Sequence, residues 1–213
     1  MTMTTWAALA LALYGVGLVT TFGVRTWSHW RATGTSGFRG LSGAVGSLPW
    51  WGGVLFAGAL VLTALGLALA TTGATPVIEA SAALAWAGLT LTVAAFVGVV
   101  LAQSGMGTSW RIGVDAAERT ALVTAGAFAL ARNPVFTAMC AALVGLTLMV
   151  PAPLTLAGLV CLVVAVELQV RAVEEPYLLA THGDEYRAYA ARVGRFIPRV
   201  GRLRSPQEQR ALR

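Results

Sequence analysis

The sequence predicts an all-α, polytopic integral membrane protein with about five transmembrane helices. Hydrophobic residues make up 57% of the 213 residues and charged residues only 11%, whereas a soluble domain typically carries about 25% charged residues. The mean hydropathy is +0.73. Apolar runs of the length needed to cross a hydrocarbon core of about 30 Å alternate with polar stretches. These three observations exclude an ordinary soluble domain.

The first predicted helix covers residues 3–24. No basic residue precedes its apolar run and no small-residue cleavage site follows it, so we expect a retained helix and not a signal peptide. Residues 25–47 mix Arg and Trp with many Gly and Ser, which predicts a loop at the level of the lipid headgroups. His29 in this loop is interpreted as a solvated side chain, with a proton carrier as the alternative.

Two further spans are predicted over residues 49–70 and 80–102. Pro49 stands near the start of the second span, beside a Trp pair that suits a membrane interface. Frequent Gly and Ala in the first three helices permit close packing and indicate a scaffold. The polar residues 103–119 precede an apolar piece that is too short to cross. Irregular backbone is tolerated beside a membrane where it lines a cavity, so we expect a pocket wall, with a plain connector as the alternative.

The fourth and fifth spans, residues 134–150 and 154–170, are predicted to form a hairpin. The joint Pro151-Ala152-Pro153 leaves room only for an antiparallel return. Pro134 suits the first helical position with Asn133 as its N-cap, and the free N–H groups there can receive a ligand carboxylate.

The fifth helix is predicted to continue beyond the membrane as far as Gly183, a typical C-terminal stop. A short amphipathic cytoplasmic helix then follows, capped by Asp184 and ending near Arg192.

The distribution of basic residues predicts the orientation. All 15 are Arg, and they lie in the first loop, in the third loop and after the fifth span. The positive-inside rule then places those loops and the tail in the cytoplasm and the N-terminus outside, in what we expect to be a bacterial inner membrane. The net charge of +6 is assigned to anionic lipid and topology, and not to nucleic acid.

The two cysteines give no sign of a metal site or a disulfide. Cys140 and Cys161 fall in separate predicted spans without a CxxC motif or a nearby His. We therefore interpret them as small buried hydrophobes and expect no metal ligands.

Charged residues cluster where the fifth span leaves the membrane. Arg171 lies four residues from both Glu167 and Glu175 and three from Glu174, so it can pair with any of them on a helix. Glu167 lies at the membrane border, where an unpaired charge is expensive, and it is either functional or part of an ion-pair ladder. Adjacent helical side chains point about 100° apart, so one of Glu174 and Glu175 can pair internally while the other faces a ligand.

Several short motifs follow one another at and after the hairpin. They are Arg132-Asn133-Pro134-x-Phe136, Arg171-x-x-Glu174-Glu175, Gly183-Asp184-Glu185-Tyr186-x-x-Tyr189 and Val193-x-Arg195-Phe196-Ile197-Pro198. In order and spacing they resemble the isoprenylcysteine carboxyl methyltransferase family, which is related to the phospholipid methyltransferases. The resemblance covers about residues 103–198. It divides the chain into a three-helix scaffold (1–102), a methyltransferase-like catalytic region (103–198) and a basic cytoplasmic tail (199–213).

The resemblance implies S-adenosylmethionine as methyl donor, S-adenosylhomocysteine as product and a lipophilic acceptor that enters from the bilayer. Its implied cofactor-binding residues are Ala121, Leu122, Val123, Phe128, Asn133, Pro134, Val135, Phe136, Glu174 and Glu175. We expect Arg171, or as second choice Arg195, to orient a carboxylate acceptor as the catalytic arginine. Prenylcysteine enzymes commonly have His and Tyr where this chain has Thr120, Phe128, Asn133 and Phe136. Carboxylate, amine, thiol and isoprenoid-linked acceptors therefore all stay open, as does the oligomeric state.

Two other functions are alternatives. Membrane sterol reductases, which use NADPH, share a related Asn-Pro and Tyr-rich pattern, but this chain lacks their many additional spans. A non-enzymatic membrane protein, such as a transport accessory or a small-solute carrier, is the second alternative. The lack of inverted repeats and of charges within the first three spans argues against a transporter.

Overall fold

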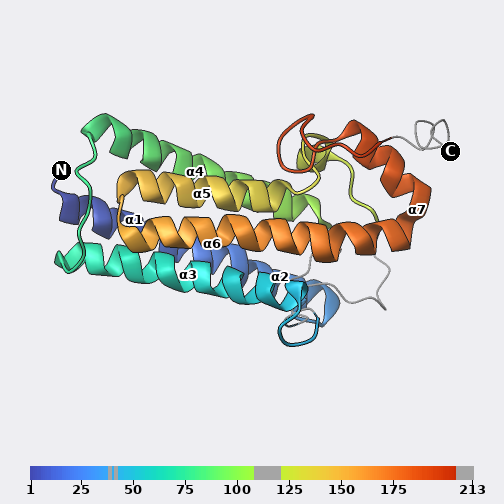
Figure 1. Ribbon diagram of the computed structural model, residues 1–213, viewed down its shortest axis with the longest axis horizontal. Coiled ribbons are helices and arrows are strands. Elements are labelled where there is room, and N and C mark those ends of the chain that lie inside the picture. Colours follow the sequence, from blue (N-terminus) through green and yellow to red (C-terminus); the bar gives the residue numbers. More distant parts are fainter. Residues whose placement is uncertain (38–39, 41–42, 108–120, 205–213) are drawn as a thin grey trace.

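The computed structural model describes residues 1–37, 40, 43–107 and 121–204, which form an elongated bundle of helices (Figure 1). No strand occurs in these described ranges, which confirms the predicted all-α class. Two π-helical segments, Val19–Val24 and Val170–Glu174, join consecutive helices, and a short 3-10 helix covers Gly126–Ala129. The α-helices are α1 (Met3–Leu18), α2 (Arg25–Thr33), α3 (Leu48–Thr72), α4 (Ala82–Gly105), α5 (Pro134–Met149), α6 (Pro153–Gln169) and α7 (Glu175–Arg192).

Within the described part of the chain, four continuous helices are long and apolar enough to cross a membrane. They are Met3–Thr33, Leu48–Thr72, Ala82–Gly105 and Pro153–Arg192. The predicted fourth span is α5, whose 16 residues correspond to about 24 Å at 1.5 Å per residue. The predicted count of about five spans therefore depends on this shorter helix, which packs against α4 and α6. The helical stretch from Pro153 to His182, before the break at Gly183, is about 45 Å long at 1.5 Å per residue, so α7 extends past a hydrocarbon core of about 30 Å.

The first helix is longer than the sequence predicted. It was expected to end at residue 24, but it continues through the π-helical segment into α2 and ends at Gly34, whose φ is +76°. The side-chain amide of Gln103 donates to the carbonyl of Thr21 at 3.2 Å and so gives a backbone group in this wide turn a partner. The expected loop therefore begins only after Thr33. The interpretation of His29 as a solvated side chain is also wrong, because His29 on α2 is only 6% exposed.

Close packing through small residues joins the helices in two pairs, α3 with α6 and α4 with α5. A Cβ atom on Gly145 would lie 2.3 Å from Oγ1 of Thr92 and 2.6 Å from the carbonyl of Gly88. A Cβ atom on Gly158 would lie 2.4 Å from Oγ1 of Thr63. Backbones can approach this closely only where glycine is present, as expected for helices that associate in lipid.

The predicted Pro-turned hairpin is confirmed. The hydroxyl of Thr155 accepts from the N–H of Ala152 at 3.1 Å and donates to the carbonyl of Val150 at 2.8 Å, which fixes the joint between α5 and α6. The N–H of Ile78 donates to Pro151 at 3.0 Å. The second loop and the hairpin turn therefore lie at the same end of the bundle.

The opposite end of the bundle carries α2, the start of α5, α7 and the C-terminal segment (Figure 1). The arginines within the described residues thus lie at one end of the bundle and the Arg-free turns lie at the other, as the sequence predicted. Gly183 interrupts α7 with a φ of +51° and a ψ of −121° before the helix resumes to Arg192. Gly183 therefore ends one helix and a second helix follows to Arg192, as the sequence predicted.

Candidate functional site

A buried carboxylate between two arginines is the centre of the polar end. Glu175 begins α7 and is 8% exposed. Its Oε1 accepts from Nη2 of Arg132 at 2.5 Å and from Nε of Arg195 at 2.8 Å, and its Oε2 accepts from Nη2 of Arg195 at 2.9 Å. We name these three residues the Arg–Glu–Arg cluster. Charge-assisted and bidentate bonds of this kind are the strong ones, and the hydrogen bonds to Glu175 raise the pKa of Arg195 above its usual range.

Arg132 connects this cluster to the C-terminal segment. Its side chain is 1% exposed. Nη1 donates to the carbonyls of Ala190 and Val193 at 3.0 and 3.4 Å, and Nη2 donates to Gly201 at 3.1 Å. The Arg132 Cζ atom also lies 6.0 Å from the ring centroid of Tyr186, within cation–π range. One side chain therefore holds α7 and the residues after it against the start of α5.

No role was predicted for Arg132 from the sequence. A signal for it was present, since Arg132 is the lone charge between the apolar piece at 121–131 and the apolar run of α5. Such a charge needs a partner. Its partner Glu175, however, is 43 residues away in the chain, too far for a spacing rule to identify.

The backbone on both sides of Asn133 is hydrogen-bonded to the segment that follows α7. The N–H groups of Arg132 and Asn133 donate to the carbonyls of Gly194 and Arg195 at 2.9 and 3.1 Å. The hydroxyl of Thr137 donates to the carbonyl of Phe196 at 2.8 Å. Gly194 is required here because a Cβ atom would lie 2.0 Å from the carbonyl oxygen of Ile197. The turn before α5 is thus built from two distant stretches of chain.

Asn133 occupies the predicted N-cap position, but its side chain does not cap the helix. Its Nδ2 instead donates to the carbonyl of Arg195 at 3.1 Å, so the predicted capping bond is wrong. Within the described residues no acceptor is hydrogen-bonded to the N–H groups of Val135 and Phe136, and Pro134 has no N–H group. The uncapped start of α5 therefore presents two donors and the positive end of the helix dipole, which suits an anionic group such as a carboxylate.

Two of the remaining predicted cofactor residues, Leu122 and Phe128, contact α7. The hydroxyl of Tyr189 donates to the carbonyl of Phe128 at 2.6 Å and holds the 3-10 turn in place. Leu122 packs against the buried group formed by Tyr186, Tyr189 and Ala190. Ala121 is exposed and Val123 is half-buried. Residues 108–120, which include Thr120 and most of the expected pocket wall, lie outside the described residues.

The two adjacent glutamates differ in burial, as the sequence predicted. Glu175 is paired internally, whereas Glu174 is only half-buried at the junction between the π-helical segment and α7. Arg171 lies on the exposed side of this junction and forms an ion pair with Glu167, which confirms that it pairs with one of the three carboxylates. Of the two predicted catalytic arginines, Arg195 is therefore part of the cluster and Arg171 is not.

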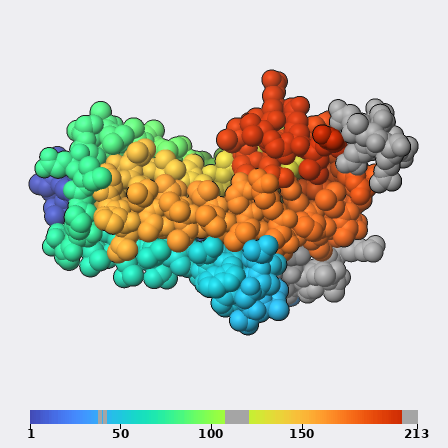
Figure 2. All heavy atoms as spheres, viewed as in Figure 1, coloured from blue at the N-terminus to red at the C-terminus, as the bar shows by residue number. Residues whose placement is uncertain are grey.

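The surface is indented near these residues. Figure 2 shows the indentation between the red C-terminal segment and the green and gold atoms of α4 and α5, with yellow atoms from the start of α5 at its bottom. The uncapped start of α5 and the segment that is bound to it thus lie next to a recess in the surface.

Comparison with known proteins covers part of this site, including Asn133 and Glu175 but not Arg195. Residues 83–185 match the family model described as phospholipid methyltransferase. No curated protein and no solved structure matches the chain. The matched range runs from α4 through the Asn133 turn and the hairpin to Glu174 and Glu175. This stretch of the chain is therefore similar to the phospholipid methyltransferases, as the resemblance of its motifs implied.

Proposed function

We propose that the protein is an S-adenosylmethionine-dependent methyltransferase that acts at the cytoplasmic membrane face on a lipophilic acceptor. The family match over residues 83–185 supports methyl transfer. The observation that carries the proposal is the double attachment of Arg195, whose backbone binds the Asn133 turn and whose side chain binds Glu175. This attachment brings the two implied halves of the cofactor site, at 133–136 and 174–175, to one end of the bundle.

The residues at this end fit the proposed cofactor. The N–H groups of Val135 and Phe136, which have no acceptor among the described residues, match the carboxylate of the methionine portion. Glu174 is half-buried beside the cluster and provides an acceptor for ammonium or hydroxyl donors. Leu122 and Phe128 give the neighbouring loop an apolar lining. When bound, S-adenosylmethionine supplies an electrophilic methyl group on a positively charged sulfur.

The chain's contribution to the reaction is positional. An acceptor atom forms a bond to the methyl carbon while the carbon–sulfur bond breaks and its electron pair stays on sulfur, so neither a metal nor a redox partner takes part. Catalysis then depends on holding the acceptor in line. Arg171, at the membrane border and 59% exposed in its side chain, is placed to attract a carboxylate, and carboxyl O-methylation is the reaction that we favour.

The predicted orientation suits this function. The arginines within the described residues share one end of the bundle with the proposed site. Under the positive-inside rule that end is cytoplasmic, where a water-soluble cofactor is available. The lipophilic acceptor would reach the same level from the bilayer along the helices.

Replacement of Glu174 tests the cofactor assignment. We expect Glu174→Ala to lose measurable S-adenosylhomocysteine binding in isothermal titration calorimetry of the detergent-purified protein, because the half-buried carboxylate is removed. Glu185→Ala, at an exposed carboxylate of α7, is the matched control and should bind like wild type. Wild-type affinity in Glu174→Ala would remove this residue from the site.

Replacement of Arg171 tests the acceptor assignment. Arg171→Ala should lose transfer of radiolabelled methyl groups into a total lipid extract while it keeps its affinity for S-adenosylhomocysteine. Arg187→Ala, at another exposed arginine that pairs with a neighbouring carboxylate, should transfer normally. If the wild type transfers no label and its melting temperature rises with NADPH but not with S-adenosylhomocysteine, the protein is a reductase and the proposal fails.

A further inference from the structure

One face of α2 combines exposed tryptophans with an arginine. Trp27 and Trp30 are each 55% exposed, and the guanidinium of Arg31 lies 5.0 Å from the Trp27 ring centroid. Positions three and four residues apart share a helix face. We name Trp27, Trp30 and Arg31 the α2 edge. Its exposed aromatic area stays unpaired with the bundle while its positive charge faces outward.

The charge of this edge is not balanced locally. The first carboxylate in the sequence is Glu79. Within the described residues no carboxylate pairs with Arg31. Arg25, by contrast, donates through Nη2 to the carbonyl of Gly107 at 2.7 Å and so ties α2 to the end of α4. Arg31 is thus the cation of α2 that remains directed away from the bundle.

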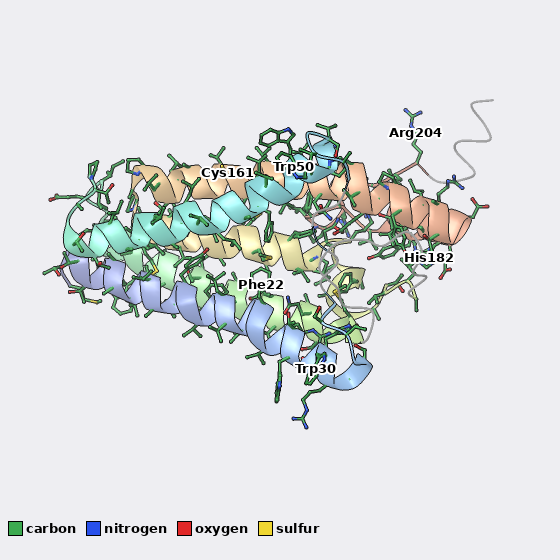
Figure 3. All side chains as sticks on the ribbon, turned by 90° about the horizontal axis from the view of Figure 1, so that it is seen from below. Phe22, Trp30, Trp50, Cys161, His182 and Arg204 are labelled. Carbon is green, nitrogen blue, oxygen red and sulfur yellow. The ribbon has the colours of Figure 1, made fainter. Side chains whose placement is uncertain are left out.

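A second pair of tryptophans marks the same level on another side of the bundle. Trp50 and Trp51, in the first turn of α3, form an edge-to-face pair with ring centroids 4.9 Å apart. Figure 3 shows Trp30 and Trp50 on opposite sides of the bundle at nearly the same position along its long axis. His182 and Arg204 lie farther out along that axis (Figure 3). Tryptophan is enriched where helices leave the hydrocarbon core, so this level is the membrane boundary on the site's side.

We propose that the α2 edge binds the phosphate headgroups of anionic phospholipids at this boundary. The two indole rings suit the apolar border of the headgroup layer, and Arg31 supplies the complementary charge. The occupant is a lipid rather than a protein because the edge stands at the same level as Trp50 and Trp51 and its cation has no acidic partner among the described residues. The site residues then lie just outside the surface to which the edge is bound.

The test measures binding of fluorescent phosphatidylglycerol to the purified full chain in phosphatidylcholine–detergent micelles. Arg31→Gln should weaken binding roughly fivefold, since one basic residue near an anionic surface contributes about 1 kcal/mol. Arg204→Gln removes an exposed arginine from the same end of the bundle and should leave binding unchanged. Circular dichroism melts of each variant check that the fold is kept.

A second pair of variants tests the aromatic part of the edge. Trp30→Leu should weaken phosphatidylglycerol binding, whereas Trp86→Leu should not, because Trp86 is equally exposed at 55% but lies near the start of α4 at the other end. Equal losses in Arg31→Gln and Arg204→Gln would mean diffuse attraction and overturn the proposal. Wild-type binding in Arg31→Gln, or equal affinity of the wild type for fluorescent phosphatidylcholine, would overturn it as well.

Discussion

The middle of the bundle and its polar end are held together by opposite means. In the middle, Gly145 and Gly158 leave out a side chain so that neighbouring helices touch through their backbones and through threonine hydroxyls. At the end, Arg132, Glu175 and Arg195 meet through charge-assisted hydrogen bonds in a nearly dry environment. The middle is therefore stabilised by glycines that carry no side chain, and the polar end by charged side chains that bond to one another. A larger residue should destabilise the middle, whereas a truncated side chain should destabilise the polar end.

Removal of the central carboxylate should have the largest effect. Glu175→Ala leaves Arg132 and Arg195 as buried charges without their partner, and loss of one member of such a group costs about 3–5 kcal/mol of unfolding free energy. Denaturant unfolding in detergent, followed by circular dichroism, measures it. Glu175→Gln keeps the shape of the side chain and part of its hydrogen bonding, so its unfolding free energy should lie between those of the wild type and Glu175→Ala. A Glu175→Ala protein as stable as the wild type would show that the cluster does not hold this end together.

Addition of a single methyl group should have a smaller effect in the middle. Gly145→Ala places a Cβ atom 2.3 Å from Oγ1 of Thr92, so α4 and α5 must separate, and overpacking typically costs about 1–3 kcal/mol. Gly58→Ala on α3 is the matched control, since nothing lies within 4 Å of its added Cβ atom. The same unfolding measurement should find Gly58→Ala unchanged or slightly more stable. Equal losses for the two variants would refute close approach as the cause.

Removal of an exposed charge should have the smallest effect. Glu167 and Arg171 form an i, i+4 pair with side chains 40% and 59% exposed, and such pairs contribute about 0.3–0.5 kcal/mol. Glu167→Ala should therefore change the unfolding free energy by less than about 1 kcal/mol. If Glu167→Ala lost as much unfolding free energy as Glu175→Ala, the Glu167–Arg171 pair would stabilise the fold as strongly as the Arg–Glu–Arg cluster does.

Much of the fold follows from signals within short stretches of sequence. The spans at α3 and α4, the hairpin and the break at Gly183 were predictable because apolar run length, Pro and Gly act locally. The helical nature of α2 was missed because Arg and Trp were interpreted as loop residues, although Trp27, Trp30 and Arg31 have helical spacing. A basic residue is tolerated at the end of a long helix because its head reaches the interface. The composition of a segment was thus a poorer guide there than its periodicity.

The site was less predictable than the fold for a physical reason. The Glu167–Arg171 pair follows from helical geometry, and the different surroundings of Glu174 and Glu175 follow from their angular separation. The contacts of Glu175 with Arg132 and Arg195 span 43 and 20 residues, and no spacing rule determines such distant partners. The local rule even failed at Asn133, where the carbonyl of Arg195 accepts the side-chain hydrogen bond in place of the helix start.

The hydrogen bond from Nη2 of Arg132 to the carbonyl of Gly201 joins residues that are 69 positions apart, and this separation limits when the polar end can form during synthesis. Translation proceeds from the N-terminus, so the hairpin of α5 and α6 is synthesised, and can enter the bilayer, before the last partners of Arg132 exist. The turn at Asn133 can therefore close only after residues 194–201 have left the ribosome, so the polar end matures later than the hairpin next to it.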